Sequence, residues 1–379
     1  MNFELSEEQT AVQLAARDFA QNELLPGVIE RDTEQKFPVE QVRKMGELGF
    51  MGMMVDPVYN GGGMDTVSYA LAMEEISKVD ASAAVCMSVN NSLVCWGLEK
   101  FGTAEQKEKY LKRLAAGEVI GAFCLSEPEA GSDATSQRTT AEDKGEYYLL
   151  NGTKNWITNG KSASVYLVIA QTDATKRHKG INALIVERGM EGFIVGKKED
   201  KMGIRGSDTH SLMFTDVKVP KKNRIGDDGF GFSFAMTTLN GGRIGIASQA
   251  LGIAAGAYEL ALNYSKERKA FGKHLAEHQA IQFKLADMAT KIDAARLLVW
   301  QAAYLKDQGK DFVKAAAMAK LYASQIAQEV TTEAVQIHGG YGYVKEFHVE
   351  RLMRDAKITQ IYEGTTEIQK MVISRELLR

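Results

Sequence analysis

The sequence predicts an α+β fold, mostly α, in three consecutive domains. These are an N-terminal helical domain at 1–118, a middle antiparallel β-barrel or sandwich domain at 119–226, and a C-terminal four-helix bundle at 227–379. The first and last thirds have apolar residues at helical spacing, whereas the middle third has short runs rich in β-branched and aromatic residues. A length of 379 residues accommodates about two or three domains.

Helix-start signals define the N-terminal domain. Segments 6–9 (SEEQ) and 103–106 (TAEQ) both have the capping-box pattern, in which a hydroxyl and an amide side chain satisfy free N–H groups at the start of a helix. Leu14, Asp18 and Phe19 follow the first box at helical spacing. We therefore expect helices from Ser6 to about Gly117.

Four short apolar runs predict the strands of the middle domain. They are 147–150 (YYLL), 164–169 (SVYLVI), 181–186 (INALIV) and 211–214 (SLMF). No helix of useful length separates them, so parallel crossover connections are not expected and the strands should pair antiparallel. Asn151-Gly152 follows the first run and is expected to form a turn.

An apolar stripe predicts the C-terminal bundle. Leu285, Met288, Ile292, Ala295 and Val299 recur three and four residues apart, which places them on one face of a helix. Such a stripe of Met and Leu is more often core packing than a binding groove. We therefore assign it to contacts with other helices.

Composition argues against several classes of protein. The net charge of -3 and the pI of about 6.2, without an extended basic run, give no attraction for nucleic acid. Cys86, Cys95 and Cys124 have neither metal-ligand nor redox spacing, so we expect reduced, buried thiols. Charges or glycines interrupt every apolar stretch, so no membrane insertion is expected. The N-terminus has no signal or transit peptide pattern, which predicts a cytoplasmic protein.

Three familiar motifs fail on inspection. Gly160-Lys161-Ser162 resembles the end of a phosphate-binding loop, but Asn155 occupies the place of the leading glycine. Segment 274–278 (HLAEH) fits a zinc pattern without a third ligand, so two surface histidines are expected there and no metal. The glycine clusters at 61–63 and 339–340 lack the pattern that a nicotinamide dinucleotide needs.

Segment 361–368 (IYEGTTEI) is the strongest candidate for a catalytic site. Glu363 stands between an aromatic residue that can shield it and Gly364, which permits close approach of a substrate. Thr365 or Thr366 can cap a following helix. By itself the segment is more often a solvated helix end.

Two further segments are unusually rich in polar groups. Segment 123–133 (FCLSEPEAGSD) offers hydroxyls and backbone N–H groups that could hold a phosphate or a ring. In 155–160 (NWITNG), Trp156 and Thr158 face the same side of a strand and could pack on an isoalloxazine. Ordinary core burial explains Trp156 equally well.

Several ordered motifs together point to a known family. They are 125–128 (LSEP), 131–133 (GSD), 156–159 (WITN), 198–205 (KEDKMGIR), Arg268 with Phe271-Gly272, Gln279, Gln336 with 339–342 (GGYG), and 362–365 (YEGT). With these motifs the chain resembles the acyl-CoA dehydrogenase family over essentially its whole length. The resemblance is closest to the short-chain (butyryl-CoA) members.

The resemblance implies that FAD is bound without a covalent link. Cofactor contacts are expected from the first two flavin segments at Phe123, Cys124, Leu125, Ser126, Gly131, Ser132, Trp156, Ile157 and Thr158. Arg268, Phe271 and Gln279 match contacts to the diphosphate and adenosine portion, and Thr365, Thr366 and Glu367 match further FAD contacts. Gln336, Ile337, His338, Gly339 and Gly340 match a stretch that reaches the FAD of a neighbouring subunit, which implies a homotetramer built as a dimer of dimers.

The same resemblance implies the reaction. Glu363 would remove the pro-R α-proton of an acyl-CoA while the β-hydrogen passes as hydride to flavin N5, giving trans-2-enoyl-CoA and sending electrons to an electron-transferring flavoprotein. Substrate contacts are expected from Ser132, Asn240, Gly241, Gly242, Arg243, Tyr362 and Gly364. A helix starting at Thr366 should lower the pKa of Glu363 slightly. Burial by the acyl chain and Tyr362 should raise it more, so we expect substrate to switch the base on.

Differences between branches of the family bear on the identity of the base and on the class of substrate. Some branches carry the base just before the arginine that matches Arg243, but that position is Gly242 here, so Glu363 has no rival. Residues 81–98 contain no charged side chain, which disfavours a dicarboxylic substrate. Asn240 and His338 depart from the commoner acid and apolar residues of the family. An acyl-CoA oxidase that uses oxygen and a non-catalytic CoA-thioester scaffold are the alternatives.

Overall fold

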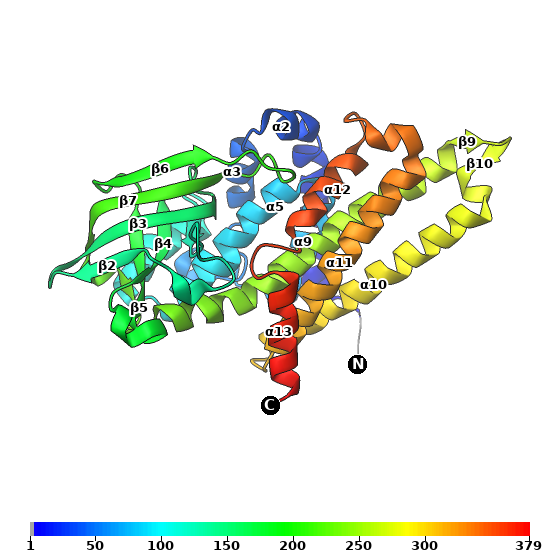
Figure 1. Ribbon diagram of the computed structural model, residues 1–379. Helices are drawn as coiled ribbons and strands as arrows, with labels where there is room; N and C mark the ends of the chain where they lie inside the picture. Colours follow the sequence, from blue (N-terminus) through cyan, green and yellow to red (C-terminus); the bar gives the residue numbers. More distant parts are fainter. Residues whose placement is uncertain (1–3) are drawn as a thin grey trace.

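A computed structural model of the protein describes residues 4–379. The β-sheet lies at one end of the molecule, long helices lie at the other end, and the N-terminal helices lie between them (Figure 1). Both capping boxes form, because Ser6 accepts from the backbone N–H of Gln9 and Thr103 accepts from that of Gln106. The predicted helical first third is confirmed. Its helices are α1 (Glu7–Phe19), α2 (Val28–Glu34), α3 (Val39–Glu47), α4 (Thr66–Val79), α5 (Ala81–Ser88), α6 (Trp96–Phe101), α7 (Ala104–Gln106) and α8 (Lys112–Ala115).

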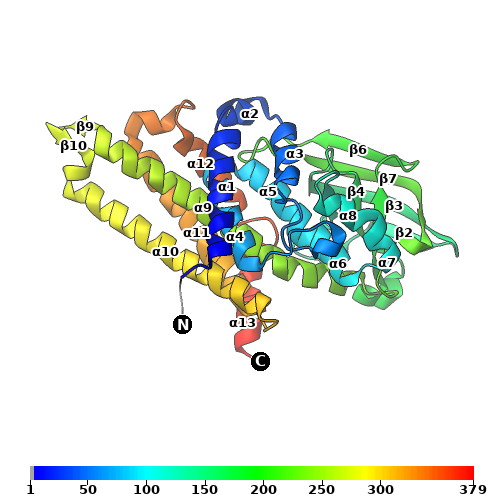
Figure 2. The ribbon, with the colours of Figure 1, turned by 180° about the vertical axis from the view of Figure 1, so that it is seen from behind.

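Helices α1 and α4 cross the middle of the molecule, as the reverse view shows (Figure 2). Helices α5 and α6 are joined by the π-helical turn Val89–Cys95, so Ala81–Phe101 is one continuous helical segment. This segment and Gly231–Glu267 are long and apolar enough to span a bilayer, contrary to the expectation that every apolar stretch is interrupted. In the structure 94% and 83% of their most apolar windows are buried, as in core helices.

The predicted middle sheet is confirmed: three of the four apolar runs lie wholly within strands of it, and the run 164–169 does so from Val165 onward. The strands are β1 (Gly121–Cys124), β2 (Thr140–Asp143), β3 (Tyr147–Thr158), β4 (Val165–Gln171), β5 (Ile181–Glu187), β6 (Phe193–Lys198), β7 (Thr209–Pro220) and β8 (Arg224–Ile225). Their order is β6-β7-β3-β2-β4-β5-β8, with β1 beside β4.

Two details of the sheet differ from expectation. Strand β1 pairs with β4 in parallel, as does Thr140 at the start of β2, so the sheet is mixed rather than purely antiparallel. The intervening β2–β3 pair provides the long connection that a parallel pairing requires. Asn151-Gly152 forms no turn, because it continues β3 at a register shift against β7. A bulge there bends the strand where Asn151 bonds Asp216.

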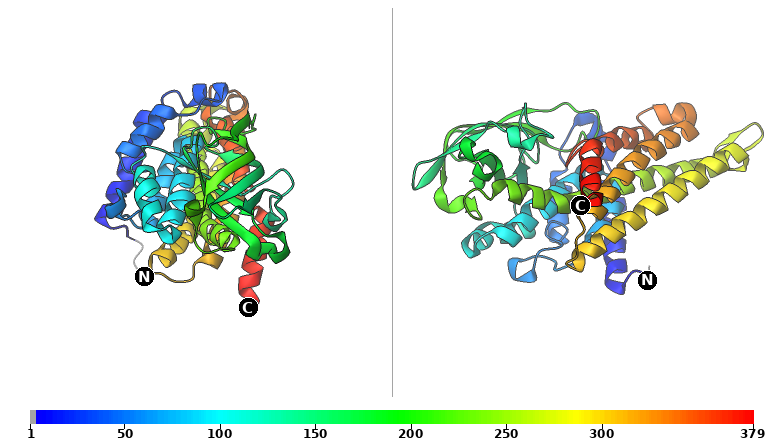
Figure 3. Two further views of the ribbon diagram at one scale, coloured as in Figure 1. Left: turned by 90° about the vertical axis from the view of Figure 1, so that its left-hand side faces the viewer. Right: turned by 60° about the horizontal axis from the view of Figure 1, so that its bottom comes forward.

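The C-terminal third is helical as predicted. It contains α9 (Gly231–Glu267), α10 (Gln279–Asp307), α11 (Val313–His338), α12 (His348–Ile358) and α13 (Thr366–Leu377), and the hairpin β9 (Lys269–Ala270) with β10 (Lys273–His274). The whole predicted stripe from Leu285 to Val299 is buried on α10. Helix α13 projects from the body of the molecule (Figure 3).

Helix α9 connects the two ends of the protein. It packs against β4 and β5 at its start, against α4 in the middle and against α10 and α11 along most of its length. Figure 1 shows it running from the sheet to the β9–β10 hairpin at the opposite end. A residue near one end of α9 is therefore held far from a residue near the other end, because one continuous helix separates them.

Candidate active site

The loop between α12 and α13 carries the candidate base. Glu363 (φ 50°) and Gly364 (φ 95°) are consecutive residues in the left-handed region, which turns the chain sharply before α13. Such a conformation costs energy for glutamate and is retained where the surroundings enforce it. Helix α13 begins at Thr366, as expected, and the side chain of Thr365 accepts from the backbone N–H of Ile368 at 3.4 Å.

The carboxylate of Glu363 is aimed into the protein without a partner. The residue as a whole is half-buried, but its Oε2 atom is buried and makes no hydrogen bond within the part of the chain that the structure describes. A Cβ added at Gly242 of α9 would lie 2.2 Å from this oxygen and 2.8 Å from Leu93 Cδ2. The absence of a side chain at Gly242 therefore makes the room that the carboxylate occupies.

Burial makes Glu363 a stronger base than an ordinary carboxylate. It raises the pKa of Glu363 to about 7, against the opposing effect of the charges on Lys320 and Arg243. Arg243 is itself buried, which lowers its pKa to about 10, and it donates to Asn240 Oδ1 at 2.7 Å. The sequence led us to credit the substrate with raising the pKa of Glu363. The structure differs because the polypeptide alone already does so.

Tyr362, the residue before the base, is anchored in the core. Its side chain packs against the core, and its hydroxyl donates to Gln249 of α9. Burial and the nearby charge of Glu363 raise the pKa of Tyr362 well above its usual value, so the phenol remains a donor. This contact ties the base loop to the middle of α9.

The two segments expected to contact flavin lie side by side. The backbone N–H of Asn155 donates to the carbonyl of Ser126 at 2.9 Å, and Lys154 Nζ donates to the carbonyl of Leu125 at 2.9 Å. Lys154 is fully buried and also pairs with Glu127 at 2.7 Å. The end of β1 and the end of β3 therefore form one surface.

Trp156 is the exposed aromatic residue of this surface. It lies at a register shift of β3, has a φ of 56° and leaves 56% of its side chain exposed. Core burial, the competing explanation, is therefore wrong, and an open ring face is available to a planar ligand. Ile157 is only 2% exposed and Cys124 is fully buried in the sheet core, so these two present backbone rather than side chains. Phe123 is nearly buried, Thr158 is half-buried, and Gly131 and Ser132 are exposed.

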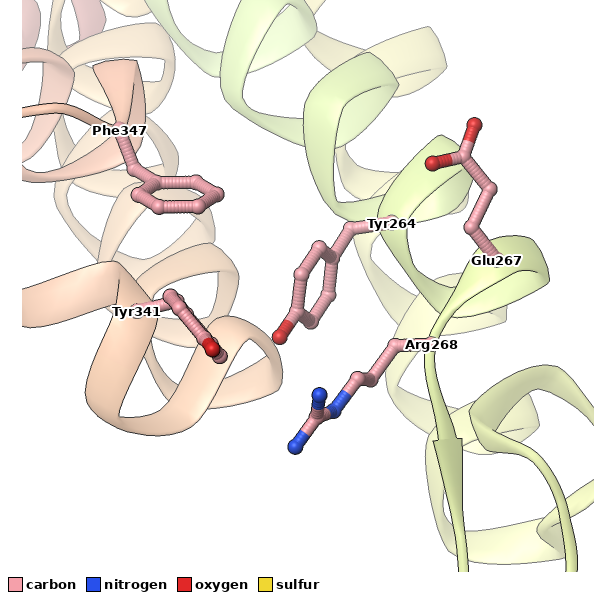
Figure 4. Close-up of a pocket in the computed structure, with 5 residues that line it drawn as sticks. All are labelled: Tyr264, Glu267, Arg268, Tyr341 and Phe347. Atoms are coloured by element: carbon pink, nitrogen blue, oxygen red, sulfur yellow. The ribbon is translucent and has the colours of Figure 1, made fainter.

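A second group of expected residues lines a cavity of about 550 Å³ at the far end of α9 and α11. Its lining includes Arg268 and the stretch from Ile337 to Gly340. Figure 4 shows the adjoining pocket, where the Arg268 guanidinium lies 5.5 Å from the ring centroid of Tyr341. A Cβ at Gly339 or Gly340 would have no neighbour within 4 Å, so the backbone there is accessible.

His338 has a structural place in this cavity. It is 5% exposed, stacks on Tyr264 with ring centroids 4.2 Å apart, and bonds the carbonyl of Ala334 through Nδ1 at 2.8 Å. Phe271 lies outside the lining, at the hairpin tip, and is 97% exposed. Gln279 and Gln336 are also exposed and outside the lining, as is Glu367 at the start of α13.

The base and the Arg268 cavity lie far apart within one subunit. Arg243, beside the base, and Arg268 are separated along the continuous helix α9 by about 37 Å, at about 1.5 Å per residue. From the resemblance we expected Arg268 to contact the diphosphate and adenosine portion of FAD, and the 336–340 stretch to contact the FAD of a neighbouring subunit. In the structure Arg268 and Gly339 line one cavity.

Two candidate functional residues, Lys320 and Gln369, were not predicted from the sequence. Lys320 of α11 is fully buried and donates from Nζ to the carbonyl of Gly364 at 2.5 Å. Gln369 of α13, also buried, donates to the same carbonyl at 2.8 Å. A lysine within the apolar, alanine-rich stretch 315–323 was the signal that could have identified Lys320.

The helical, β and helical regions in this order define the class of protein. Family models for the N-terminal, middle and C-terminal domains of acyl-CoA dehydrogenase match residues 6–118, 122–217 and 229–378. The chain belongs to the acyl-CoA dehydrogenase family and is an enzyme of that class.

Relatives match over the full length. A short-chain specific acyl-CoA dehydrogenase of Clostridium acetobutylicum is 51% identical over 379 residues, covering 100% of both chains. A chain from a structure of the electron transferring flavoprotein of Acidaminococcus fermentans matches with a TM-score of 0.99 and 53% identity, covering 100% of both chains. Butyryl-CoA dehydrogenase from Megasphaera elsdenii matches with a TM-score of 0.98 and 50% identity, again covering 100% of both.

Proposed function

We propose that this protein is an FAD-dependent dehydrogenase of short-chain acyl-CoA thioesters, with Glu363 as the base and an electron-transferring flavoprotein as electron acceptor. The observation that carries the proposal is the buried, unpartnered Glu363 carboxylate, whose pKa burial raises to about 7. A general base is most effective when its pKa lies near the working pH.

The residues present fit FAD. The open face of Trp156 and the adjoining backbone of 125–126 suit the planar ring system. Arg268 and the accessible backbone of Gly339 and Gly340 suit the diphosphate and adenosine portion of a neighbour's FAD. Phe271, Gln279, Gln336, Thr365, Thr366 and Glu367 complete the proposed contacts. We retain 1–118, 119–226 and 227–379 as the domain bounds.

The chemistry assigned to the chain is proton removal. When bound, FAD supplies the acceptor for the hydride that leaves the β-carbon. Glu363 takes the α-proton, and its own backbone N–H, which has no partner among residues 4–379, is available to the thioester oxygen. Asn240, Gly241, Gly242 and Arg243 would line the path of the substrate, together with Ser132, Tyr362 and Gly364. Tyr362 and Leu93 keep water from the carboxylate.

We propose that the substrates are thioesters of short, uncharged acyl groups, and we take butyryl-CoA as the reference substrate. Leu93 lies beside the base, and Val89 and Leu93 are buried in an uncharged helical segment, which suits an alkyl chain and offers no cation for a distal carboxylate. The names of the relatives from Clostridium and Megasphaera support the same choice. We further propose a homotetramer and a cytoplasmic location.

The test is anaerobic reduction of the purified protein by butyryl-CoA. The wild type should be yellow and lose its flavin absorbance within the mixing time of a manual experiment. Glu363→Gln should retain FAD and bind the thioester but bleach at least about 100-fold more slowly, because the base is gone. Normal bleaching by this variant would refute the assignment of Glu363.

Two further outcomes separate the alternatives. Steady consumption of oxygen with butyryl-CoA would favour an acyl-CoA oxidase over transfer to an electron-transferring flavoprotein. A colourless protein that binds CoA thioesters without converting them would favour a scaffold.

A further inference from the structure

Lys320 is a buried cation directly behind the base loop. It is 0% exposed on α11, where Ala316, Ala317 and Ala323 are buried as well. Within residues 4–379 its side chain makes one hydrogen bond, from Nζ to the carbonyl of Gly364 at 2.5 Å. Placing an amine in such surroundings is costly, so a buried lysine that serves only as filler is not expected.

The carbonyl that Lys320 contacts belongs to the strained turn. Gly364 and Glu363 are both left-handed, and the backbone of this pair determines where the Glu363 carboxylate lies. Gln369 Nε2 donates to the same carbonyl at 2.8 Å and approaches that of Glu363 at 3.4 Å. The turn is therefore held from behind by one charged and one neutral donor.

The charge of Lys320 acts on Glu363 without direct pairing. No ion pair joins their side chains within the described residues, so Lys320 leaves the carboxylate free to meet substrate. Opposite charges in a buried site stabilise one another even without a direct ion pair. Burial lowers the pKa of Lys320 to about 7, while the charge of Glu363 raises it.

Other titratable or charged groups near the pair come from four elements. They are Tyr69 of α4, Arg243 of α9, Glu367 and Arg375 of α13, and Tyr362 of the loop itself. Tyr69 and Tyr362 are held protonated by burial and carry no charge. Arg243 is the other cation that acts on Glu363, and Arg375 acts on Arg243.

We propose that Lys320 is a positioning residue of the reaction: it fixes the Glu363–Gly364 turn through the Gly364 carbonyl, and its positive charge keeps the Glu363 carboxylate ionised before substrate binds. The inference rests on the proposed role of Glu363. The hydrogen bond to Gly364 needs no charge, because a neutral donor such as Gln369 could supply it. The proposal therefore gives the positive charge of Lys320 a function of its own.

The test is the pH profile of kcat/KM for butyryl-CoA in Lys320→Met. The acidic limb of that profile reports the free enzyme's base, which must be deprotonated to act. Removing a nearby positive charge favours the protonated acid, so the pKa of Glu363 rises and the limb moves to higher pH. A shift of about 1 pH unit or more is expected. An acidic limb at the wild-type pH would overturn the proposal.

Gln369→Met is the matched control, because it removes the neutral donor to the same carbonyl atom. It should lower kcat at all pH values while the limb stays at the wild-type pH. Lys320→Arg carries the positive charge at every pH, so its limb should not move to higher pH. A shift of equal size in Gln369→Met would mean that displacement of the loop, rather than charge, moves the limb, and would overturn the electrostatic part.

Two precautions keep the result interpretable. FAD content and the circular dichroism spectrum are measured first, and Lys320→Gln replaces Lys320→Met in the same comparison if that variant does not fold. A wild-type protein that butyryl-CoA fails to reduce would refute the proposed function itself. A reducible wild type with an unmoved limb in the neutral variant would refute only the role of Lys320.

Discussion

Gly242 and Glu363 are complementary in space, since the carboxylate fills the volume that a side chain at position 242 would need. A methyl group at Gly242 would lie 2.2 Å from Glu363 Oε2, far inside van der Waals contact. Gly242→Ala should therefore displace the base and lower kcat by about 100-fold, which is the order of loss caused by a 1 Å misplacement. Steady-state assays with butyryl-CoA, combined with flavin absorbance to confirm FAD retention, measure this.

Gly241→Ala provides the comparison for that prediction. It adds the same methyl group to the same helix, but the nearest atom, Lys306 Cε, lies at 4.0 Å, an ordinary contact. Its loss of kcat should be much smaller than that of the neighbouring variant. Equal losses in the two variants would indicate a general effect on α9 rather than a collision with Glu363.

At the scale of residues, the sequence predicted what depends on neighbours in the chain and missed what depends on contacts between distant segments. Glu363 was identifiable because its neighbours Tyr362 and Gly364 lie next to it in the chain. The elevated basicity was assigned to substrate because burial by α9 and α11 is not encoded locally. The alanine-rich stretch around Lys320 is a local signal of its burial, but its link to Gly364 exists only after α11 packs against the loop.

At the scale of elements, the buried pair Lys154–Glu127 joins the ends of β1 and β3. Lys154 is 0% and Glu127 is 4% exposed, and Lys154 also donates to Leu125 and Gln137. Lys154→Met would leave a carboxylate buried without its cation, so the free energy of unfolding should fall by about 3–5 kcal/mol. FAD retention should fall as well, since this pair holds both proposed flavin segments.

Chemical denaturation and the ratio of flavin to protein absorbance measure the two effects. The double variant Lys154→Met with Glu127→Gln should recover part of the stability, because it removes the unpaired charge. If the single and double variants lose the same stability, the cost arises from packing and the argument about charge is incorrect.

The elements that the sequence predicted are those with strong local signals. Capping boxes marked α1 and α7, and the stripe from Leu285 to Val299 marked α10. The parallel pairing of β1 with β4 was missed because strand partners depend on contacts between distant segments. Asn151-Gly152 was misassigned because a dipeptide suited to a hairpin also suits a bulge, and the pairing with β7 decides between them.

At the scale of the whole molecule, α9 separates two groups of residues that we propose to be half-sites of the FAD site. The first proposed half-site has the base and the exposed Trp156, and the second has the cavity lined by Arg268 and Gly339. Tyr341, which is 49% exposed, lines the cavity of the second half-site. Phe271 and Tyr343 are close to its lining residues in the chain and are 97% and 87% exposed. Exposed aromatic residues beside a proposed half-site are typical of a surface that a second copy covers.

Complementation between inactive subunits follows from this separation. Glu363→Gln should be inactive but able to lend Arg268, and Arg268→Glu should bind its neighbour's FAD poorly but retain its own base. In a mixed pair, one of the two sites combines an intact Glu363 with an intact Arg268. Random pairing of equal amounts makes half of the pairs mixed, so co-expression should restore about a quarter of the wild-type activity.

The measurement is the rate of butyryl-CoA oxidation by the co-purified subunits, compared with the two variants purified separately and combined after assembly. Activity no greater than that of the separate variants would mean that each subunit completes its FAD site alone, in which case the cavity at the hairpin end has another purpose.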